Sequence, residues 1–258
     1  MKRKISFKKI ILGIVIVLVL IVAVAAVAFK VYTSNYYVAD DTAIEEVVKD
    51  LSDEVHSFET DDGMVFLPVN QQYKAVIVFY PGGRVEYKAY SGLMYRLAQR
   101  GYICLLPRMP ENLALLSINA VDKLKASNAE DQAMVDGLDW YLAGHSLGGV
   151  AAVKYLAAAV GKFKGVILCA SYPTESLKDA DLRLLSIIGS NDEVIKMAGY
   201  EDGKANWPED STEYVIQGGI HSYFGNYGIQ KGDGEPEITA EQQLDETADV
   251  IDKWIKGE

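Results

Sequence analysis

A serine flanked by glycines is the feature of this sequence with the clearest chemical meaning. Ser146 lies in the segment GHSLG (144–148), directly after the apolar run 140–143. A Gly-x-Ser-x-Gly segment between a strand and a helix is typical of a nucleophile elbow, where glycines leave room for a sharp turn and the serine projects above the sheet. The Ala-rich run 150–160 predicts the helix that this turn requires. Ser146 is therefore the predicted nucleophile.

A serine hydroxyl attacks an ester or amide only when a base removes its proton and a third group orients that base. The chain has three histidines. His145 would point away from the serine in an elbow, and His56 precedes the predicted core. His221 lies in a glycine-flanked loop after a predicted strand, at the edge of the sheet where open α/β proteins build their sites. His221 is therefore the predicted base.

An acidic residue between the serine and the base would complete the catalytic set. Asp192 follows the predicted strand 182–188 and stands at its carboxyl end, where it would reach the same edge of the sheet as His221. An acidic residue in such a turn also commonly serves only as a turn or helix cap. Asp192 is the preferred acid, and the nearby alternatives are Glu193 and Asp202.

The oxyanion of an acyl-transfer intermediate needs two hydrogen-bond donors. One is expected from the backbone amide of Leu147, immediately after the nucleophile. The other is expected from Gly83, in the turn YPGGR (80–84) that follows the predicted strand 74–80. Arg84 is an alternative donor, or its guanidinium could hold a substrate carboxylate. The remaining interpretation is that residues 80–84 form a glycine-containing turn that does not contact any ligand.

The region around these residues predicts a shallow, open site. The connection 171–181 between the strands 166–170 and 182–188 is too short for a lid domain. Walls are expected from residues 108–114 and 223–234. The aromatic residues that could line an acyl pocket there, or could simply pin the loop to the core, are Tyr223, Phe224 and Tyr227.

Apolar strands alternate with helices along most of the chain, which predicts a mostly parallel sheet with helices on both faces. A hairpin signal at Asp62 and Gly63 predicts an antiparallel pair of strands within 56–69. The last helix is expected from Thr239, which forms a capping box with Gln242. The other strands are expected at 74–80, 102–106, 140–143, 166–170, 182–188 and 213–216, and the other helices at 42–55, 87–99, 112–127 and 150–160.

The N-terminal residues predict a membrane anchor. Residues 10–29 form an uncharged apolar run, and 20 residues as a helix would span about 30 Å of hydrocarbon. Lysines and an arginine precede this run, so the remainder of the chain is expected outside the cytoplasm. A cleaved signal peptide, which would give a secreted form, is the alternative. The expected segments are 1–9 in the cytoplasm, 10–29 in the membrane, 30–55 as a stalk with a short helix, and 56–258 as the catalytic domain.

Charge and motif content exclude several functions. The first thirty residues hold six of the 25 basic residues and none of the 36 acidic ones, so the exported part is acidic and a poor nucleic-acid binder. The sequence has no paired ligand spacing for a metal and no phosphate-binding glycine motif after a strand. No metal and no cofactor are therefore expected.

Four segments together resemble the α/β-hydrolase superfamily, specifically its small lidless branch related to dienelactone hydrolases, from about residue 65 to 255. The order Ser146, Asp192, His221 is the order of the triad in that superfamily. Dienelactone hydrolases use a cysteine nucleophile, whereas position 146 here is serine, so dienelactone substrates are not implied. The segments that carry the resemblance are VFYPGG (78–83), GHSLGG (144–149), GSND (189–192) and GGIHSYFGNYG (218–228).

The resemblance also implies an order of strands in the sheet. In this order the strands that contain Cys104 and Cys169 are separated by two others, so the only two cysteines are expected to be unpaired core residues.

These inferences predict a membrane-tethered serine hydrolase outside the cytoplasm that resembles a carboxylesterase and cleaves small esters through an acyl-enzyme. His221 would deprotonate Ser146, and Asp192 would orient His221. An acyltransferase would use the same residues, with another hydroxyl in place of water. A surface binding protein that has kept the fold without activity is the alternative from another class.

Overall fold

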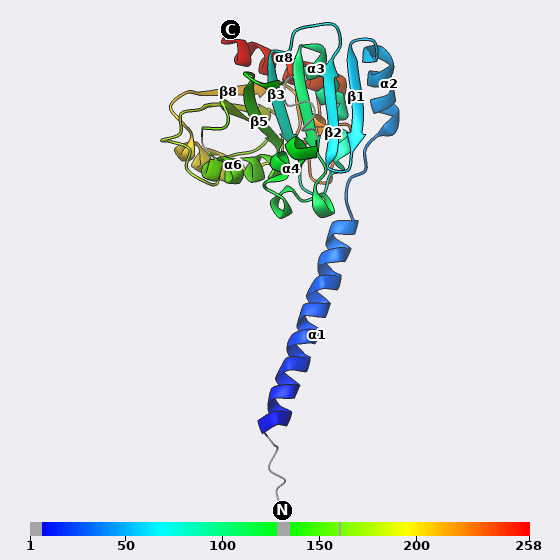
Figure 1. The fold of residues 1–258 in the computed structure, drawn as a ribbon, viewed down its shortest axis with the longest axis vertical. Helices are drawn as coiled ribbons and strands as arrows, with labels where there is room; N and C mark the ends of the chain where they lie inside the picture. The colour runs from blue at the N-terminus through cyan, green and yellow to red at the C-terminus, as the bar shows by residue number, and fades with distance from the viewer. Residues whose placement is uncertain (1–6, 128–134, 160) are drawn as a thin grey trace, which may run out of the picture. The chain divides into compact units, whose positions relative to one another are not determined.

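In the described part of the chain, eight strands form one sheet (Figure 1). The order is β1-β2-β4-β3-β5-β6-β7-β8; β2 runs antiparallel to both neighbours, and all other pairs from β4 to β8 are parallel. The prediction of a hairpin followed by a parallel sheet is confirmed. The strands are β1 Val55–Thr60, β2 Gly63–Pro68, β3 Ala75–Tyr80, β4 Tyr102–Pro107, β5 Asp139–His145, β6 Gly165–Cys169, β7 Arg183–Gly189 and β8 Ser211–Ile216.

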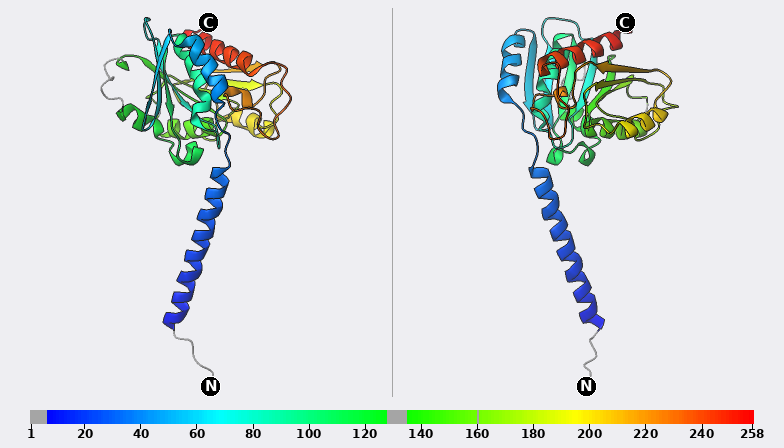
Figure 2. Two further views of the ribbon diagram at one scale, coloured as in Figure 1. Left: turned by 90° about the vertical axis from the view of Figure 1, so that its right-hand side faces the viewer. Right: turned by 180° about the vertical axis from the view of Figure 1, so that it is seen from behind.

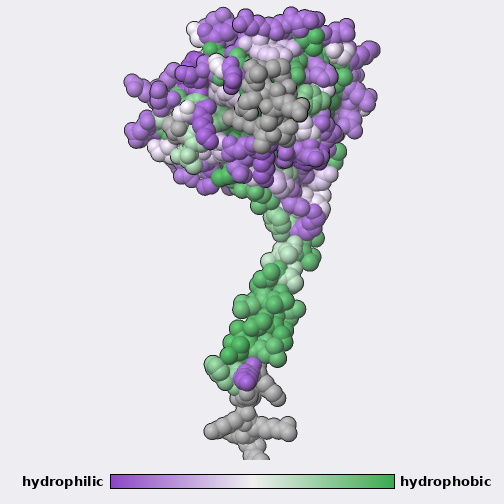
Figure 3. Space-filling view, in the orientation of Figure 1, coloured by the Kyte–Doolittle hydropathy of each residue, from purple (hydrophilic) through white to green (hydrophobic). Residues whose placement is uncertain are grey.

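This computed structural model describes residues 7–127, 135–159 and 161–258. The chain divides into two compact units, Met1–Tyr36 and Tyr37–Glu258. In the first unit, the helix α1 covers Phe7–Ser34. Its segment Ile11–Ser34 is long and apolar enough to cross a membrane, and an 18-residue stretch within it has a mean hydropathy of 3.4. Figure 3 shows that most of the surface of this helix is hydrophobic.

Helices cover both faces of the sheet in the second unit. Side chains from one face of β3 belong to the same core cluster as α2, α3 and α8, and those from the other face belong to a cluster with α4 and α6. The helices lie on both sides of the sheet in Figure 2. The two core layers therefore lie on opposite sides of one sheet, as the strand–helix alternation predicts. The helices are α2 Asp41–Leu51, α3 Ser91–Gln99, α4 Ala120–Ser127, α6 Leu147–Ala159, α7 Met197–Gly203 and α8 Ala240–Lys256.

The helix expected at 112–127 is shorter in the structure. Two short 3-10 turns, Pro110–Asn112 and Ala114–Leu116, precede α4, which begins at Ala120. Glu111 and Asn112 have φ values of 52° and 54°, in the left-handed region that interrupts an α-helix. This interruption of the helix has a structural role, because it allows the Asn112 carbonyl to accept a hydrogen bond of 2.8 Å from the amide of Arg84.

The second unit begins at Tyr37, well before the boundary expected near His56. Residues expected to form a stalk belong to its core, since Ala39 and Val47 are buried against the α3 and α8 side of the sheet. Asp40 caps α2 by accepting a hydrogen bond of 3.1 Å from the amide of Ala43.

Two further expectations concern single residues. Thr239 and Gln242 form the predicted capping box at the start of α8. Cys104 on β4 and Cys169 on β6 are separated by β3 and β5, in the order that the resemblance implies. Both cysteines are free and buried, and burial raises the pKa of each thiol.

Gly148 allows α6 to pack against the end of β3. A Cβ at this position would overlap the backbone carbonyls of Tyr80 and Pro81. Gly148→Ala should lower the free energy of unfolding by about 1–3 kcal/mol, because backbone atoms cannot move aside as a flexible side chain would. Thermal unfolding of the purified full-length chain should show a fall in Tm of several degrees.

Ala157→Ser is the matched control for this prediction, because Ala157 is exposed on the same helix. We expect it to change the stability by less than about 0.5 kcal/mol. A Gly148→Ala variant as stable as this control would show that the approach of α6 to β3 is not tight.

Candidate active site

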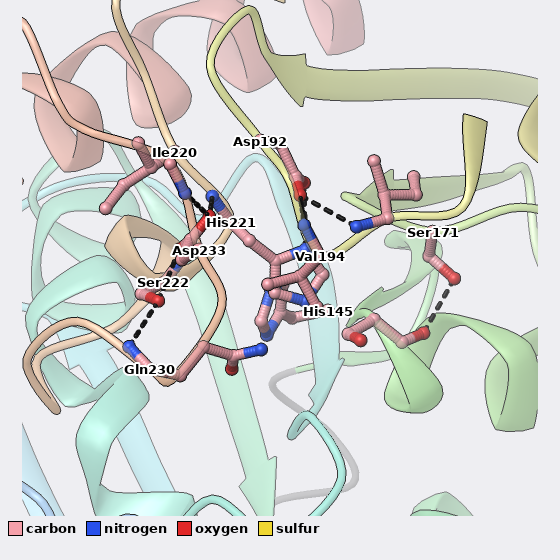
Figure 4. Close-up of polar contacts among 12 residues, drawn as sticks. His145, Ser171, Asp192, Val194, Ile220, His221, Ser222, Gln230 and Asp233 are labelled. Carbon is pink, nitrogen blue, oxygen red and sulfur yellow. Dashed lines mark hydrogen bonds and ion pairs between the residues drawn. The ribbon is translucent and has the colours of Figure 1, made fainter.

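Ser146 is the single residue between β5 and α6, and its backbone is strained. Its φ of 50° lies in the left-handed region, which a residue other than glycine adopts rarely. The Ser146 amide donates a hydrogen bond of 2.9 Å to the carbonyl of Cys169. The Ser146 carbonyl accepts bonds of 3.0 Å from the Gly149 amide and 2.7 Å from the Ser171 hydroxyl (Figure 4). These contacts fix the backbone conformation expected of a nucleophile elbow.

Asp192 and His221 form a buried hydrogen-bonded pair. Asp192 Oδ2 lies 2.8 Å from His221 Nδ1, and the two side chains are 1% and 2% exposed. Asp192 Oδ1 accepts hydrogen bonds of 2.9 Å and 2.8 Å from the amides of Val194 and Ile195 (Figure 4). An ionised carboxylate only accepts hydrogen bonds, so Nδ1 of His221 carries the proton and Nε2 is left as the basic atom.

The preference for Asp192 over its neighbours agrees with this geometry. Glu193 and Asp202 are exposed, whereas the Asp192 carboxylate is directed at the imidazole of His221.

His145 connects the elbow to His221. Its ring centroid lies 4.6 Å from that of His221, and its side chain is buried. Among the described residues, the Ser146 hydroxyl makes no hydrogen bond to His221. Such bonds often tighten only when substrate is bound. The contact that the structure shows between the elbow and His221 is the packing of the His145 ring on the His221 ring. His56, the third histidine, is exposed on β1.

Tyr90 links His145 to the turn after β3. The Tyr90 hydroxyl accepts a hydrogen bond of 2.9 Å from the Gly82 amide and lies 2.8 Å from Nδ1 of His145. One hydrogen bond therefore joins the Tyr90 hydroxyl and Nδ1 of His145, and the buried Nε2 of His145 has no hydrogen-bond partner among the described residues. Burial, and next the neighbouring His221, hold the pKa of His145 well below its usual value, so this imidazole is neutral at pH 7.

The two expected oxyanion donors lie side by side. A Cβ on Gly83 would be 2.8 Å from Cδ2 of Leu147 and 3.2 Å from its Cβ. Neither the Gly83 nor the Leu147 amide donates a hydrogen bond to a described residue. The amide of Arg84 donates a hydrogen bond to Asn112, and that of Gly82 donates one to Tyr90. Of these three amides in the turn, that of Gly83 therefore remains available to donate to an oxyanion. The Arg84 amide is therefore excluded as an oxyanion donor in this conformation.

The aromatic residues after His221 pin their loop to the core. Phe224 is fully buried and its ring lies 5.6 Å from that of His145, so the substrate contact expected for Phe224 is corrected to a packing role. Tyr227 is 7% exposed and packs on Tyr37 and Tyr90. Tyr223 is half-buried and is the one of the three with substantial exposed surface.

Asp233 holds the backbone of the loop that carries His221, a role the sequence analysis missed. Its carboxylate accepts hydrogen bonds of 3.2 Å from the His221 amide and of 2.7 Å and 2.5 Å from the Ser222 amide and hydroxyl (Figure 4). The Ser222 hydroxyl in turn accepts one of 2.9 Å from the Gln230 amide. The Asp233-Gly234 pair is a turn signal that could have marked this residue.

The remaining expectations concern the surroundings of the site. Between β6 and β7 the structure contains no helix, so no helical lid is inserted there. Among the described residues, no group of three or more His, Cys, Asp or Glu side chains is arranged to hold a metal ion.

A comparison with known families decides the classification. The model of the alpha/beta hydrolase family matches residues 76–245, a range that runs from β3 into α8 and contains Ser146, Asp192 and His221. The chain belongs to the alpha/beta hydrolase family. A search of curated proteins found no match. For this alpha/beta hydrolase, the resemblance at the level of the superfamily is confirmed, while the link to the dienelactone branch stays a prediction.

The low pKa of His145 predicts a pH-dependent stability. As pH falls below about 6.5, the unfolded chain takes up a proton at this residue and the folded alpha/beta hydrolase does not. The free energy of unfolding should therefore fall with decreasing pH by up to about 1.4 kcal/mol per unit from this group. The His145→Asn variant lacks this titrating group. Urea denaturation should therefore show that the difference in free energy of unfolding between wild type and variant becomes smaller from pH 7 to pH 5.

His56→Asn is the matched control, because this side chain is exposed. It should retain the wild-type slope of stability against pH. Parallel curves for wild type and His145→Asn would contradict a neutral, buried His145.

Proposed function

We propose that this alpha/beta hydrolase is a serine hydrolase of the carboxylesterase type that cleaves small esters through an acyl-enzyme. One observation carries the proposal. Ser146 sits on a left-handed turn between strand and helix, next to the histidine whose ring packs on the buried His221–Asp192 pair. The family supports hydrolysis in general, and this arrangement favours a serine nucleophile.

In the proposed reaction, Nε2 of His221 takes the proton from the Ser146 hydroxyl as its oxygen attacks the ester carbonyl carbon. The tetrahedral intermediate collapses when the bond to the leaving oxygen breaks, and His221 gives its proton to that oxygen. Asp192 stabilises the imidazolium that exists between the two transfers. Water, deprotonated by His221, then attacks the acyl group and releases the acid and free Ser146.

The oxyanion of each intermediate would be bound by the amides of Gly83 and Leu147. These amides have no competing acceptor among the described residues, and they lie on adjacent pieces of backbone. Leu147 also begins α6, so the positive end of the helix dipole faces the developing charge. Fixed donors of this kind lower the barrier because they need no reorganisation during the reaction.

Substrate would enter from the open side of this edge of the sheet. Tyr223 is the proposed apolar contact for the acyl group, because it is only half-buried. The Arg84 side chain, which is also half-buried, is the proposed contact for polar groups of the substrate. The absence of a helical insertion between β6 and β7 is consistent with small substrates.

We further propose that α1 anchors the protein in the cell membrane, with the hydrolase unit outside the cytoplasm. The apolar segment Ile11–Ser34 supports the anchor. The basic residues before it support the orientation, because Lys and Arg are enriched on the cytoplasmic side of membrane helices.

The triad predicts a graded loss of activity in the full-length chain purified in detergent. Ser146→Ala and His221→Ala should abolish labelling by a fluorophosphonate probe and hydrolysis of nitrophenyl esters. Asp192→Asn should lower kcat by about 10³-fold to 10⁴-fold, because the imidazole then loses its orientation and the partner of its charged form. Probe fluorescence on a gel and release of nitrophenol provide the two readouts.

The matched controls are Ser176→Ala and Asp202→Asn, whose side chains are exposed. Both should retain wild-type labelling and kcat. A folded wild-type protein that neither labels nor hydrolyses any ester would refute the serine hydrolase and would favour a binding protein on the same fold.

The membrane proposal predicts that the protein stays in the membrane pellet after alkaline carbonate extraction. Protease added to intact cells, after removal of any outer envelope, should degrade the hydrolase unit, because it lies outside the cytoplasm. Recovery of the unit in the culture medium would identify a cleaved signal peptide instead. Protection from protease until the cells are broken would contradict the orientation.

A further inference from the structure

Tyr37 is hydrogen bonded to the turn that carries the proposed oxyanion donor. Its amide donates a bond of 2.8 Å to the carbonyl of Arg84, and its carbonyl accepts one of 2.9 Å from the amide of Glu86. The two bonds form a parallel bridge between Tyr37 and Val85. Arg84 directly follows Gly83, so this bridge fixes the backbone one residue from the proposed donor.

The same tyrosine contacts the loop that carries His221. Its hydroxyl accepts a hydrogen bond of 3.0 Å from the amide of Lys231, and its ring centroid lies 5.8 Å from that of Tyr227. Three residues later, the Asp40 amide donates a bond of 2.8 Å to the carbonyl of Asn226. Residues 37–40 thus bind a second segment, far from the first in sequence.

A buried aromatic cluster joins these contacts to the catalytic groups. The Tyr227 ring lies 6.3 Å from Tyr90 and 6.5 Å from His145. Tyr90 binds the Gly82 amide, and the His145 ring packs on His221. Tyr37 therefore packs on a cluster whose other members set the positions of the oxyanion turn and of the base.

We propose that Tyr37 is a positioning residue of the active site. It holds the turn that contains Gly83 and the loop that contains His221 in fixed positions relative to each other. The inference rests on the proposed function, because it concerns the same groups. Neither the turn nor the loop is part of the sheet, so their separation depends on contacts such as these. A shift of about 1 Å between reacting groups can cost about 10²-fold in rate.

The test compares Tyr37→Ala with Tyr37→Phe in the full-length chain. Tyr37→Ala removes the ring that packs on Tyr227, and it should lower kcat for a nitrophenyl ester by about 30-fold or more while KM changes by less than about threefold. Tyr37→Phe keeps the ring and loses only the bond from Lys231, so it should restore kcat to within about threefold of wild type. Tyr36→Ala is the matched control, because Tyr36 is 38% exposed, and it should behave as wild type.

Hydrogen exchange measured by mass spectrometry gives a readout that needs no catalysis. In Tyr37→Ala, the amides of residues 82–86 and 222–231 should exchange about tenfold faster, while those of β5 and β6 should not change. If wild type has no esterase activity, the proposed function fails, and this pattern alone decides whether Tyr37 holds the two segments. If Tyr37→Ala does not fold, Tyr37→Leu replaces it, with the same pattern of exchange and a tenfold loss of kcat expected.

Two results would overturn the inference. The first is an unchanged kcat, or unchanged exchange in both segments, when the ring is removed. The second is faster exchange spread evenly over the sheet, since that would show a general loss of stability rather than release of the two segments.

Discussion

The left-handed backbone of Ser146 is the constraint on which the rest of the site depends. One residue connects β5 to α6, and a non-glycine residue in this conformation costs about 1–3 kcal/mol. Two hydrogen bonds stabilise this strained conformation. The Ser146 amide donates one to the Cys169 carbonyl, and the Ser146 carbonyl accepts one from the Ser171 hydroxyl. Gly148 lets the helix approach the end of β3 closely enough for this turn to form.

Other features of the site follow from that turn. The start of α6 at Leu147 lies beside the turn of Gly83, and within the described part of the chain neither residue's amide has a hydrogen-bond acceptor. His145 is forced inward by the alternation of side chains along β5, and it fills the space between Tyr90 and His221. Asp192 reaches His221 because parallel strands place their carboxyl ends at a common edge.

The sequence predicts this fold, and the residues proposed to react, better than it predicts the residues that support them. Strand and helix patterns are local, and Ser146, Asp192 and His221 each follow a strand directly, so the sequence could propose all three as site residues. The structure brings Asp192 and His221 into hydrogen-bond contact, and their joint role with Ser146 remains a proposal. Tyr37 and Asp233 act through contacts with residues distant in sequence or through irregular loops, where no periodicity exists. Phe224 looks the same in sequence whether it lines a pocket or, as here, packs on His145.

Trapping the covalent intermediate tests the central claim most directly, because only a nucleophilic Ser146 becomes acylated. The full-length chain would be mixed with a nitrophenyl ester, quenched with acid during turnover and digested for mass spectrometry. The account predicts one acyl group on the peptide that contains Ser146, and an unmodified peptide in the Ser146→Ala variant. Ester hydrolysis with an acyl group on another residue would contradict it, as would undiminished turnover by Ser146→Ala.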